Sequence, residues 1–179
     1  MSTMTTINDV VTLGQKTYNF IQGNQALFWE QPDEVHAIPK DMELSNLTRW
    51  GGPNTIRGFH KVRVEGLSVP DHDASDIVFA IKWRPLGCVA SGPLLGKGYF
   101  ISGARVVLEK ADINRNNQVE MHVRWYDAVR RGPAKNPISE LTVDVGISEK
   151  SRWASNNVTR TYTYTILGSG QGWQHSVTS

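Results

Sequence analysis

The chain has 179 residues, enough for one domain (residues 1–179) with a hydrophobic core of its own. Its 19 Lys and Arg residues nearly balance 17 Asp and Glu residues and are spread along the chain, which excludes the clustered basic surface typical of nucleic-acid-binding proteins. The single cysteine, Cys88, excludes an internal disulfide, so we expect a buried free thiol.

The first six residues are largely polar and contain neither Lys nor Arg, unlike the start of a secretory signal peptide. Nowhere does the chain have a run of about 18 apolar residues, so we expect no transmembrane helix. We therefore expect a protein that is made in the cytoplasm and is released, if at all, by lysis or by a dedicated secretion system.

Residues 6–23 carry the pattern of an amphipathic helix. Thr6 is a suitable N-cap with Asp9 three residues later, and Gly23 is a suitable residue for the helix end. The apolar stripe at steps of three and four contains Ile7, Val10, Val11, Gly14, Tyr18 and Ile21. We predict a helix that packs on its own sheet or, alternatively, detaches to enter a membrane interface or a neighbouring subunit. Its polar face holds Lys16 as the only cation, which does not match the Lys and Arg enrichment of interfacial helices.

Residues 24–54 contain several Pro and Gly residues and are predicted to be irregular. From residue 55 the hydrophobic period changes from 3.6 to 2, which is typical of half-buried strands. The alternating runs are residues 61–65, 77–84, 119–126, 141–148 and 158–166. Residues 97–109 are also rich in strand formers, but Gly98 and Gly103 interrupt the alternation and predict a bulge. We therefore predict an all-β protein, with an antiparallel β-sandwich body over residues 55–179 behind one N-terminal helix.

Residues 92–98, Gly-Pro-Leu-Leu-Gly-Lys-Gly, resemble a phosphate-binding loop at first reading. They lack one spacer residue and the Ser or Thr that would bind magnesium, and a strand rather than a helix is expected to follow. We interpret them as a glycine-rich turn.

The cluster Asp71-His72-Asp73 with Asp76 could bind a hard cation through carboxylate oxygens. Its spacing does not fit the EF-hand loop, so we interpret it as a solvated acidic turn and predict no metal site. The five histidines are far apart and form no zinc-binding pattern. They are His36, His60, His72, His122 and His175.

The sequence contains no motif for a catalytic nucleophile. There is no Gly-x-Ser-x-Gly elbow, and Cys88 has no recognisable partner motif. We therefore predict a protein that is not an enzyme and uses no cofactor. A triad assembled in space would leave no such motif, so an enzyme is kept as the third alternative.

A compact basic loop follows the predicted strand that ends in two aromatic residues. Cations beside aromatic rings could bind lipid phosphates or an acidic partner, whereas a solvated hairpin tip is the simpler interpretation. The candidate contact residues are Arg130, Arg131, Lys135, Trp125 and Tyr126.

In outline the chain resembles the actinoporin-like pore-forming proteins. The likeness lies in its length, one predicted helix ahead of a β-sandwich, 6 Trp and 5 Tyr residues, and the lack of a disulfide. In that family the helix inserts into lipid, and an aromatic cluster with a basic neighbour binds phosphocholine headgroups. The Arg-Gly-Asp tripeptide common in the family is missing here.

Three short segments also resemble small bacterial proteins of unknown role: residues 96–101, 136–138 and 162–168. This likeness implies a bacterial or phage-related source and no particular activity.

Two functions are left open by these patterns. The first is a protein that binds a membrane or glycan surface and oligomerises as a cytolysin-like module, with lipid headgroups or glycans as partners. The second is a self-assembling structural subunit of a capsid, filament or phage-tail-like particle, with identical subunits as partners.

Overall fold

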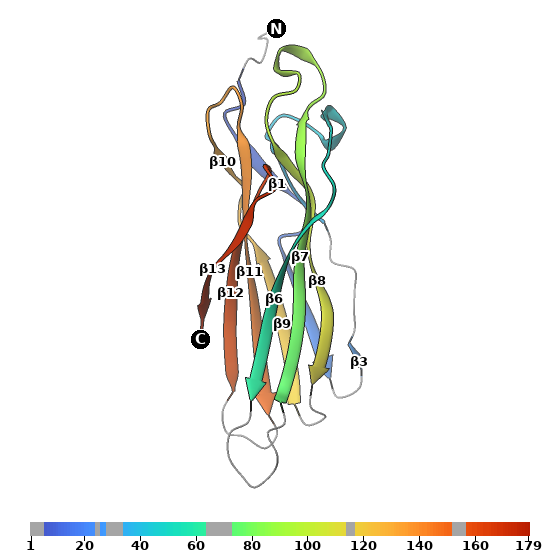
Figure 1. Cartoon of the computed structure of the whole chain (residues 1–179), viewed down its shortest axis with the longest axis vertical. Helices are drawn as coiled ribbons and strands as arrows, with labels where there is room; N and C mark the ends of the chain where they lie inside the picture. Colours follow the sequence, from blue (N-terminus) through green and yellow to red (C-terminus); the bar gives the residue numbers. More distant parts are fainter. Residues whose placement is uncertain (1–5, 24–25, 28–33, 64–72, 114–116, 152–156) are drawn as a thin grey trace.

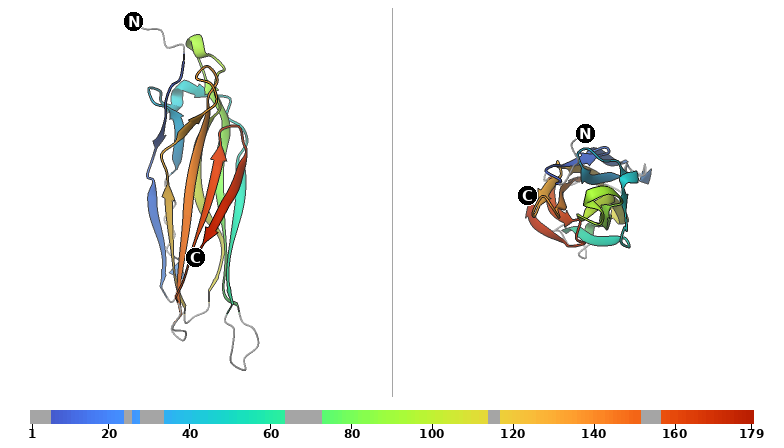
Figure 2. Two further views of the ribbon diagram at one scale, coloured as in Figure 1. Left: turned by 90° about the vertical axis from the view of Figure 1, so that its left-hand side faces the viewer. Right: turned by 90° about the horizontal axis from the view of Figure 1, so that it is seen from above.

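The computed structural model describes residues 6–23, 26–27, 34–63, 73–113, 117–151 and 157–179. In this part of the chain two antiparallel sheets pack face to face into an elongated sandwich (Figure 1). Seen along its long axis, the molecule has a narrow, rounded cross-section (Figure 2). The prediction of an all-β protein with antiparallel sheets is confirmed. Among the described residues, no helix is long and apolar enough to cross a membrane.

The first sheet, called sheet A, is built on the long central strand β7. Its strands, in spatial order, are β1 (Val10–Leu13), β4 (Val35–Pro39), β8 (Phe100–Ile113), β7 (Asp73–Val89) and β5 (Leu47–Thr48), with β6 (Asn54–Arg63) also paired to β7. Two short 3-10 helices, Leu44–Asn46 and Gly92–Leu94, lie between these strands in the sequence.

The second sheet, called sheet B, is built on β11. Its strands, in spatial order, are β13 (Gly172–Thr178), β12 (Val158–Leu167), β11 (Ile138–Ser151), β9 (Asn117–Trp125), β2 (Thr17–Gly23) and β3 (Ala26–Leu27), with β10 (Val129–Arg131) also paired to β11.

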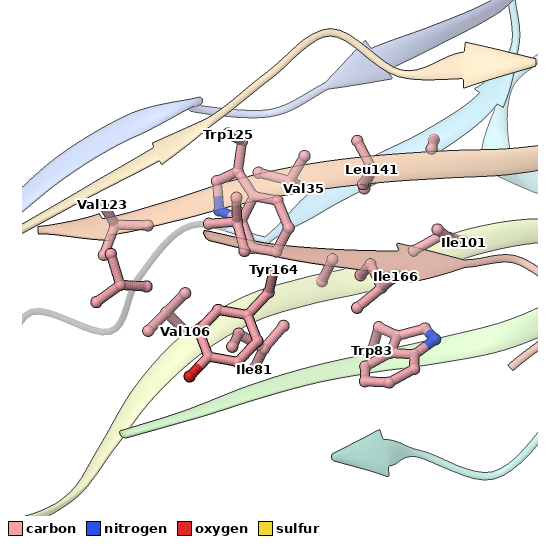
Figure 3. Packing of buried hydrophobic residues seen from close by; sticks show 14 of the residues in the cluster. Val35, Ile81, Trp83, Ile101, Val106, Val123, Trp125, Leu141, Tyr164 and Ile166 are labelled. Atoms are coloured by element: carbon pink, nitrogen blue, oxygen red, sulfur yellow. The ribbon is translucent and has the colours of Figure 1, made fainter. Parts of the chain in front are cut away.

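The core fills the space between the sheets because alternate side chains of each strand point inward. Along β9, every second residue from Asn117 to Trp125 is buried. Figure 3 shows the aromatic centre of this core, where Trp125 and Tyr164 from sheet B face aliphatic side chains of sheet A. Trp125 is 1 % exposed and Tyr164 is fully buried, so both rings contribute to folding rather than to a surface.

The helix predicted for residues 6–23 is wrong. This segment forms β1 and β2, which belong to different sheets and pair with β4 and β9. Gly14 separates them with a positive φ of 105°, and a Cβ at this position would lie 2.3 Å from the Glu34 carbonyl oxygen. The segment is rich in β-branched and aromatic residues, which favour strands, and pairing with neighbouring strands overrides the helical spacing.

The residues predicted to form the helical stripe are therefore strand and core residues. Ile7 is fully buried and Val10 is 7 % exposed, while Val11 is half-buried in β1. The structure places Val10 and Val11 on β1 and Tyr18 and Ile21 on β2, and not on a helix.

The prediction that residues 24–54 are irregular is also wrong in part. Residues 24–25 and 28–33 lie outside the described residues, but Val35–Pro39 forms β4, which is central to sheet A and largely buried. The strand pattern of this segment was not recognised in the sequence because His36 interrupts the apolar residues and Pro39 ends them.

Predictions for the glycines and the cysteine are confirmed. Residues 92–98 form a turn in which Gly92, Gly96 and Gly98 all have positive φ. Gly103 has a φ of 61°, and β8 shows register shifts in its pairing with both neighbouring strands. Cys88 is a buried free thiol.

Candidate functional site

The outer face of sheet B, which points away from the core, carries a group of polar and aromatic side chains. It arises from the alternation along β12, where Tyr162, Tyr164 and Ile166 point inward and the threonines between them point outward. We call this group the polar face of sheet B. Its members are Arg124, Tyr126, Thr142, Asp144, Thr163, Thr165, Trp173 and His175.

Asp144 connects three strands on this face. Its Oδ2 accepts a hydrogen bond of 2.6 Å from the Tyr126 hydroxyl, and its Oδ1 accepts one of 2.6 Å from Thr163 Oγ1. The Arg124 guanidinium lies 4.9 Å from the centre of the Tyr126 ring, a cation–π distance. The Tyr126 ring is therefore held in place while 37 % of the residue stays exposed.

The hydrogen bond to Asp144 raises the pKa of Tyr126, with a further contribution from partial desolvation of the phenol. Tyr126 is therefore a neutral hydroxyl at physiological pH, and it acts as a donor to the carboxylate.

Thr165 is only 1 % exposed, and it links side chains from three strands of sheet B. Its Oγ1 lies 3.0 Å from Thr142 Oγ1 on β11 and 2.7 Å from His175 Nε2 on β13. The Trp173 ring meets the His175 ring edge to face, with 5.6 Å between centroids. Trp173 remains 39 % exposed at the edge of the sheet, so one part of its ring faces solvent.

The strand register places Tyr126 and Trp173 at opposite sides of the network. Asp144 pairs with Thr163, Thr142 pairs with Thr165, and Thr165 pairs with Trp173. The strands β9, β11, β12 and β13 are consecutive neighbours. Three inter-strand spacings correspond to about 14 Å between the two aromatic sides. This face, which we also call the platform, thus has a ring at each end and hydroxyl, carboxylate and imidazole groups between them.

A second polar cluster lies in the core, between the two sheets. His60 Nδ1 of β6 is 2.9 Å from the Tyr162 hydroxyl of β12. Glu149 of β11 accepts hydrogen bonds from the Ser75 hydroxyl and, at 2.6 Å, from Asn117 Nδ2. His60 Nε2 lies 3.7 Å from Glu149 Oε2, which is ion-pair distance rather than hydrogen-bond distance. All five side chains are buried, so the cluster joins the sheets and is closed to a substrate.

The environment of Glu149 favours the carboxylate form. Burial alone would raise its pKa, but the nearby His60 imidazole and the hydrogen bonds from Ser75 and Asn117 together lower it. Because the pKa of Glu149 is lower in the folded state, its ionised form stabilises the fold above pH 4.5, its ordinary pKa.

We expect this contribution to disappear as the pH falls from 4.5 through the lower pKa of the folded state. Urea unfolding of the parent chain and of Glu149→Gln, at neutral pH and at about pH 3, measures it. The parent should lose more free energy of unfolding on acidification than the variant does. Equal losses in the two proteins would contradict a stabilising carboxylate at this position.

The Arg side chains of the basic loop, residues 130–135, are less available to a binding partner than the sequence indicates. Arg131 forms an ion pair with Glu140, and Arg130 donates hydrogen bonds to the carbonyl oxygens of Asn8 and Gly132. The ion pair and hydrogen bond with Glu140 raise the pKa of Arg131. Lys135 is exposed in the following turn. Trp125 is a core residue, so of the two predicted aromatic contacts the structure leaves only Tyr126 at the surface.

The acidic turn predicted at residues 71–76 lies partly outside the described residues, which include neither Asp71 nor His72. Asp76 forms an ion pair with Lys110, and that hydrogen-bonded partner lowers the pKa of the carboxyl. Across the described parts of the chain, no group of three or more His, Cys, Asp or Glu side chains has the arrangement of a metal site.

Most residues of the polar face of sheet B were not predicted as site residues from the sequence. The signal of this face was present in the run Thr161, Thr163 and Thr165, which places hydroxyls at every outward position of one strand. Trp173 and His175 lie beyond the last alternating run, residues 158–166, and were not assigned to a strand. The pairing of β13 with β12 brings them beside Thr165.

Comparison with known proteins adds no relative. No family model matches the chain, no curated protein is significantly similar to it, and no solved structure shares its fold at a significant level.

Proposed function

We propose that this chain is a binding protein for neutral glycans and that the polar face of sheet B is its recognition surface. The observation that carries this proposal is the pair of partly exposed rings, Tyr126 and Trp173, on either side of a hydrogen-bonded network of hydroxyls and one carboxylate.

The aromatic residues suit the apolar side of a sugar ring. A pyranose presents C–H groups on its faces and hydroxyls around its rim, and the C–H groups interact favourably with an aromatic face. Tyr126 is held by Asp144 and Arg124, and Trp173 is held by His175, so neither ring has to be ordered when a ligand arrives.

The polar residues between the rings suit the hydroxyls of a sugar. Asp144 has acceptor capacity beyond its two hydrogen bonds, and the Thr142 and Thr163 hydroxyls can both donate and accept. A platform of fixed, mostly neutral groups recognises a neutral, hydroxyl-rich ligand better than a charged one. The groups are spread over four neighbouring strands, which suits an extended oligosaccharide better than a small metabolite.

The same observations favour a glycan over a lipid headgroup. Arg131 is paired with Glu140 and Arg130 is engaged by backbone carbonyls, so the basic loop offers Lys135 as its exposed cation without an ion pair in the described structure. Because the Tyr126 hydroxyl donates a hydrogen bond to Asp144, Tyr126 belongs to the platform rather than to the basic loop.

The test is a binding screen of the purified chain against cello-, xylo-, manno- and chito-oligosaccharides, followed by calorimetric titration of each hit. We expect Tyr126→Ala and Trp173→Ala each to weaken binding by roughly tenfold or more, since each removes one stacking ring. Phe59→Ala is the matched control, because Phe59 is 63 % exposed on β6 of sheet A and lies outside the platform. Its affinity should equal that of the parent.

Two results would overturn the proposal: failure to bind any member of the panel, or binding that neither aromatic variant weakens. Vesicles of phosphatidylcholine with phosphatidylserine provide the lipid arm. Vesicle binding that is lost in Lys135→Ala and retained in Trp173→Ala would instead place a lipid-binding site at the basic loop.

A structural subunit of a larger assembly is the second candidate. The observation that favours it is the exposed edge strand β13, which can pair with another chain. The mass of the particle in solution separates an open assembly, which grows with concentration, from a closed one of fixed size.

A further inference from the structure

The C-terminal strand β13 forms an exposed edge of sheet B. It pairs with β12 on one side, and no strand of the described chain pairs with it on the other. Figures 1 and 2 show it on the outside of the sandwich, ending at the C-terminus. All residues from Trp173 to Thr178 are exposed, on both faces of the strand. An edge of this length presents unpaired backbone groups to any strand that can approach it.

This edge lacks the charges that usually keep sheet edges apart. Gly172–Thr178 contains no Lys, Arg, Asp or Glu. The neighbouring edge strand of sheet A, β6, carries Arg57 and Lys61 among its outward residues. Charged residues on an edge strand oppose pairing with another chain, so β6 is protected in a way that β13 is not.

A bulge in β13 sets which residues share a face. Tyr164 pairs with Gln174 and Thr163 pairs with Ser176, so His175 is the extra residue. Gln174 and Val177 point to the inner side, because their partners are the buried Tyr164 and Tyr162. The residues on the outer side are Trp173, His175, Ser176 and Thr178. From Trp173 to Thr178 the order of faces is outer, inner, outer, outer, inner, outer.

This order reads the same in both directions, which makes the strand complementary to itself. In antiparallel pairing, residues directly opposite each other lie on the same face of the sheet. A second copy of β13, paired in the register centred between His175 and Ser176, therefore matches outer residues with outer residues and inner with inner. The opposite pairs are Trp173 with Thr178, Gln174 with Val177, and His175 with Ser176.

We propose that two copies of this chain form a symmetric dimer by antiparallel pairing of their β13 strands about this centre. Isologous pairing uses the same surface on both copies and closes after two, so it also removes the exposed edge. Val177, which is 49 % exposed, would be covered by the opposite Gln174.

The dimer continues sheet B across both copies and leaves the two polar faces on the same side. A ligand surface with repeated sugars could then be held at two points, which increases avidity without any new contact within a copy. The dimer itself does not depend on sugar binding, so its test stands apart from that of the proposed function.

The first measurement is the mass of the chain by size-exclusion chromatography with light scattering over a range of concentrations. We expect twice the chain mass of 20.0 kDa. Val177→Lys should weaken dimerisation at least tenfold by placing a charge on the edge. Gln118→Lys, which adds the same charge at an exposed position of β9, should leave the dimer unchanged.

The second measurement tests the register by disulfide trapping in a Cys88→Ala background. Gln174→Cys with Val177→Cys places one new thiol opposite the other across the proposed interface, within reach of a disulfide. Gln174→Cys alone is the control, because the two copies of residue 174 would be three positions apart, about 10 Å. Oxidation should give a covalent dimer of the double variant and leave the single variant uncrosslinked.

A monomeric mass at every concentration would overturn the proposal, as would a mass that rises beyond two copies. Crosslinking of the single variant to the same extent, or a dimer in which the double variant does not crosslink, would overturn the β13 register.

Discussion

Replacing Glu149 by Ala is expected to lower the free energy of unfolding by about 3–5 kcal/mol, the range for removing one member of a buried ionic and hydrogen-bonded group. Ser75 and Asn117 would lose the acceptor of their hydrogen bonds, and His60 would lose its facing carboxylate. Because Ser75 and His60 come from sheet A and Glu149 from sheet B, the loss weakens the contact between the sheets.

Urea denaturation at neutral pH measures this change from the shift of the midpoint at constant slope. Glu120→Ala is the matched control, because Glu120 is exposed on the neighbouring strand β9, and its effect should stay within about 0.5 kcal/mol. A loss below about 1 kcal/mol for Glu149→Ala would mean that water or neighbouring side chains replace the carboxylate, and that the cluster does not hold the sheets together.

Replacing Gly168 by Ala is expected to destabilise the fold by about 3 kcal/mol or more, a large effect for a single methyl group. A Cβ at this position would lie 2.0 Å from the carbonyl oxygen of Tyr99 and 2.5 Å from its carbonyl carbon. Backbone atoms cannot rotate away as a side chain can. Gly168 also donates its N–H to Ser139 and accepts from Leu86 N–H, both at 2.8 Å, so a shift of the chain would strain these bonds as well.

Thermal unfolding of Gly168→Ala beside Gly146→Ala separates this clash from a general effect of removing glycine. The nearest atoms to a Cβ at Gly146 are 3.8 Å away, and this strand position does not require glycine. Gly146→Ala should leave stability unchanged or raise it by up to about 1 kcal/mol. Similar behaviour of the two variants would contradict the close approach of Gly168 to Tyr99.

The sandwich body could be predicted because its strands obey a local rule. Alternation in β9, β11 and β12 reflects burial of one face, so period 2 is visible in the sequence itself. The prediction failed for the N-terminal strands, because Val10 and Val11 in β1 and Tyr18 in β2 fit a helical stripe as well as they fit strands. Only their partners, β4 and β9, decide between the two, and these partners are far away in the sequence.

The candidate site was harder to predict than the fold. Tyr126 was assigned to a surface role beside the basic loop, and it lies at the surface, but its closest contacts are Asp144 and Arg124. The site depends on the register that sets Asp144 beside Thr163 and Thr165 beside Trp173. Register follows from packing over the whole sheet, so a single sequence does not reveal which outward residues become neighbours.

The separation of β1 and β2 into different sheets affects how the chain reaches its native state. Thr17 in β2 pairs with Arg124 of β9, which lies far along the sequence. β2 therefore lacks its β9 partner until much of this chain has been made, whereas β1 pairs with the nearer strand β4. Closure of such distant contacts slows folding. We therefore expect the contact between β2 and β9 to form late in folding.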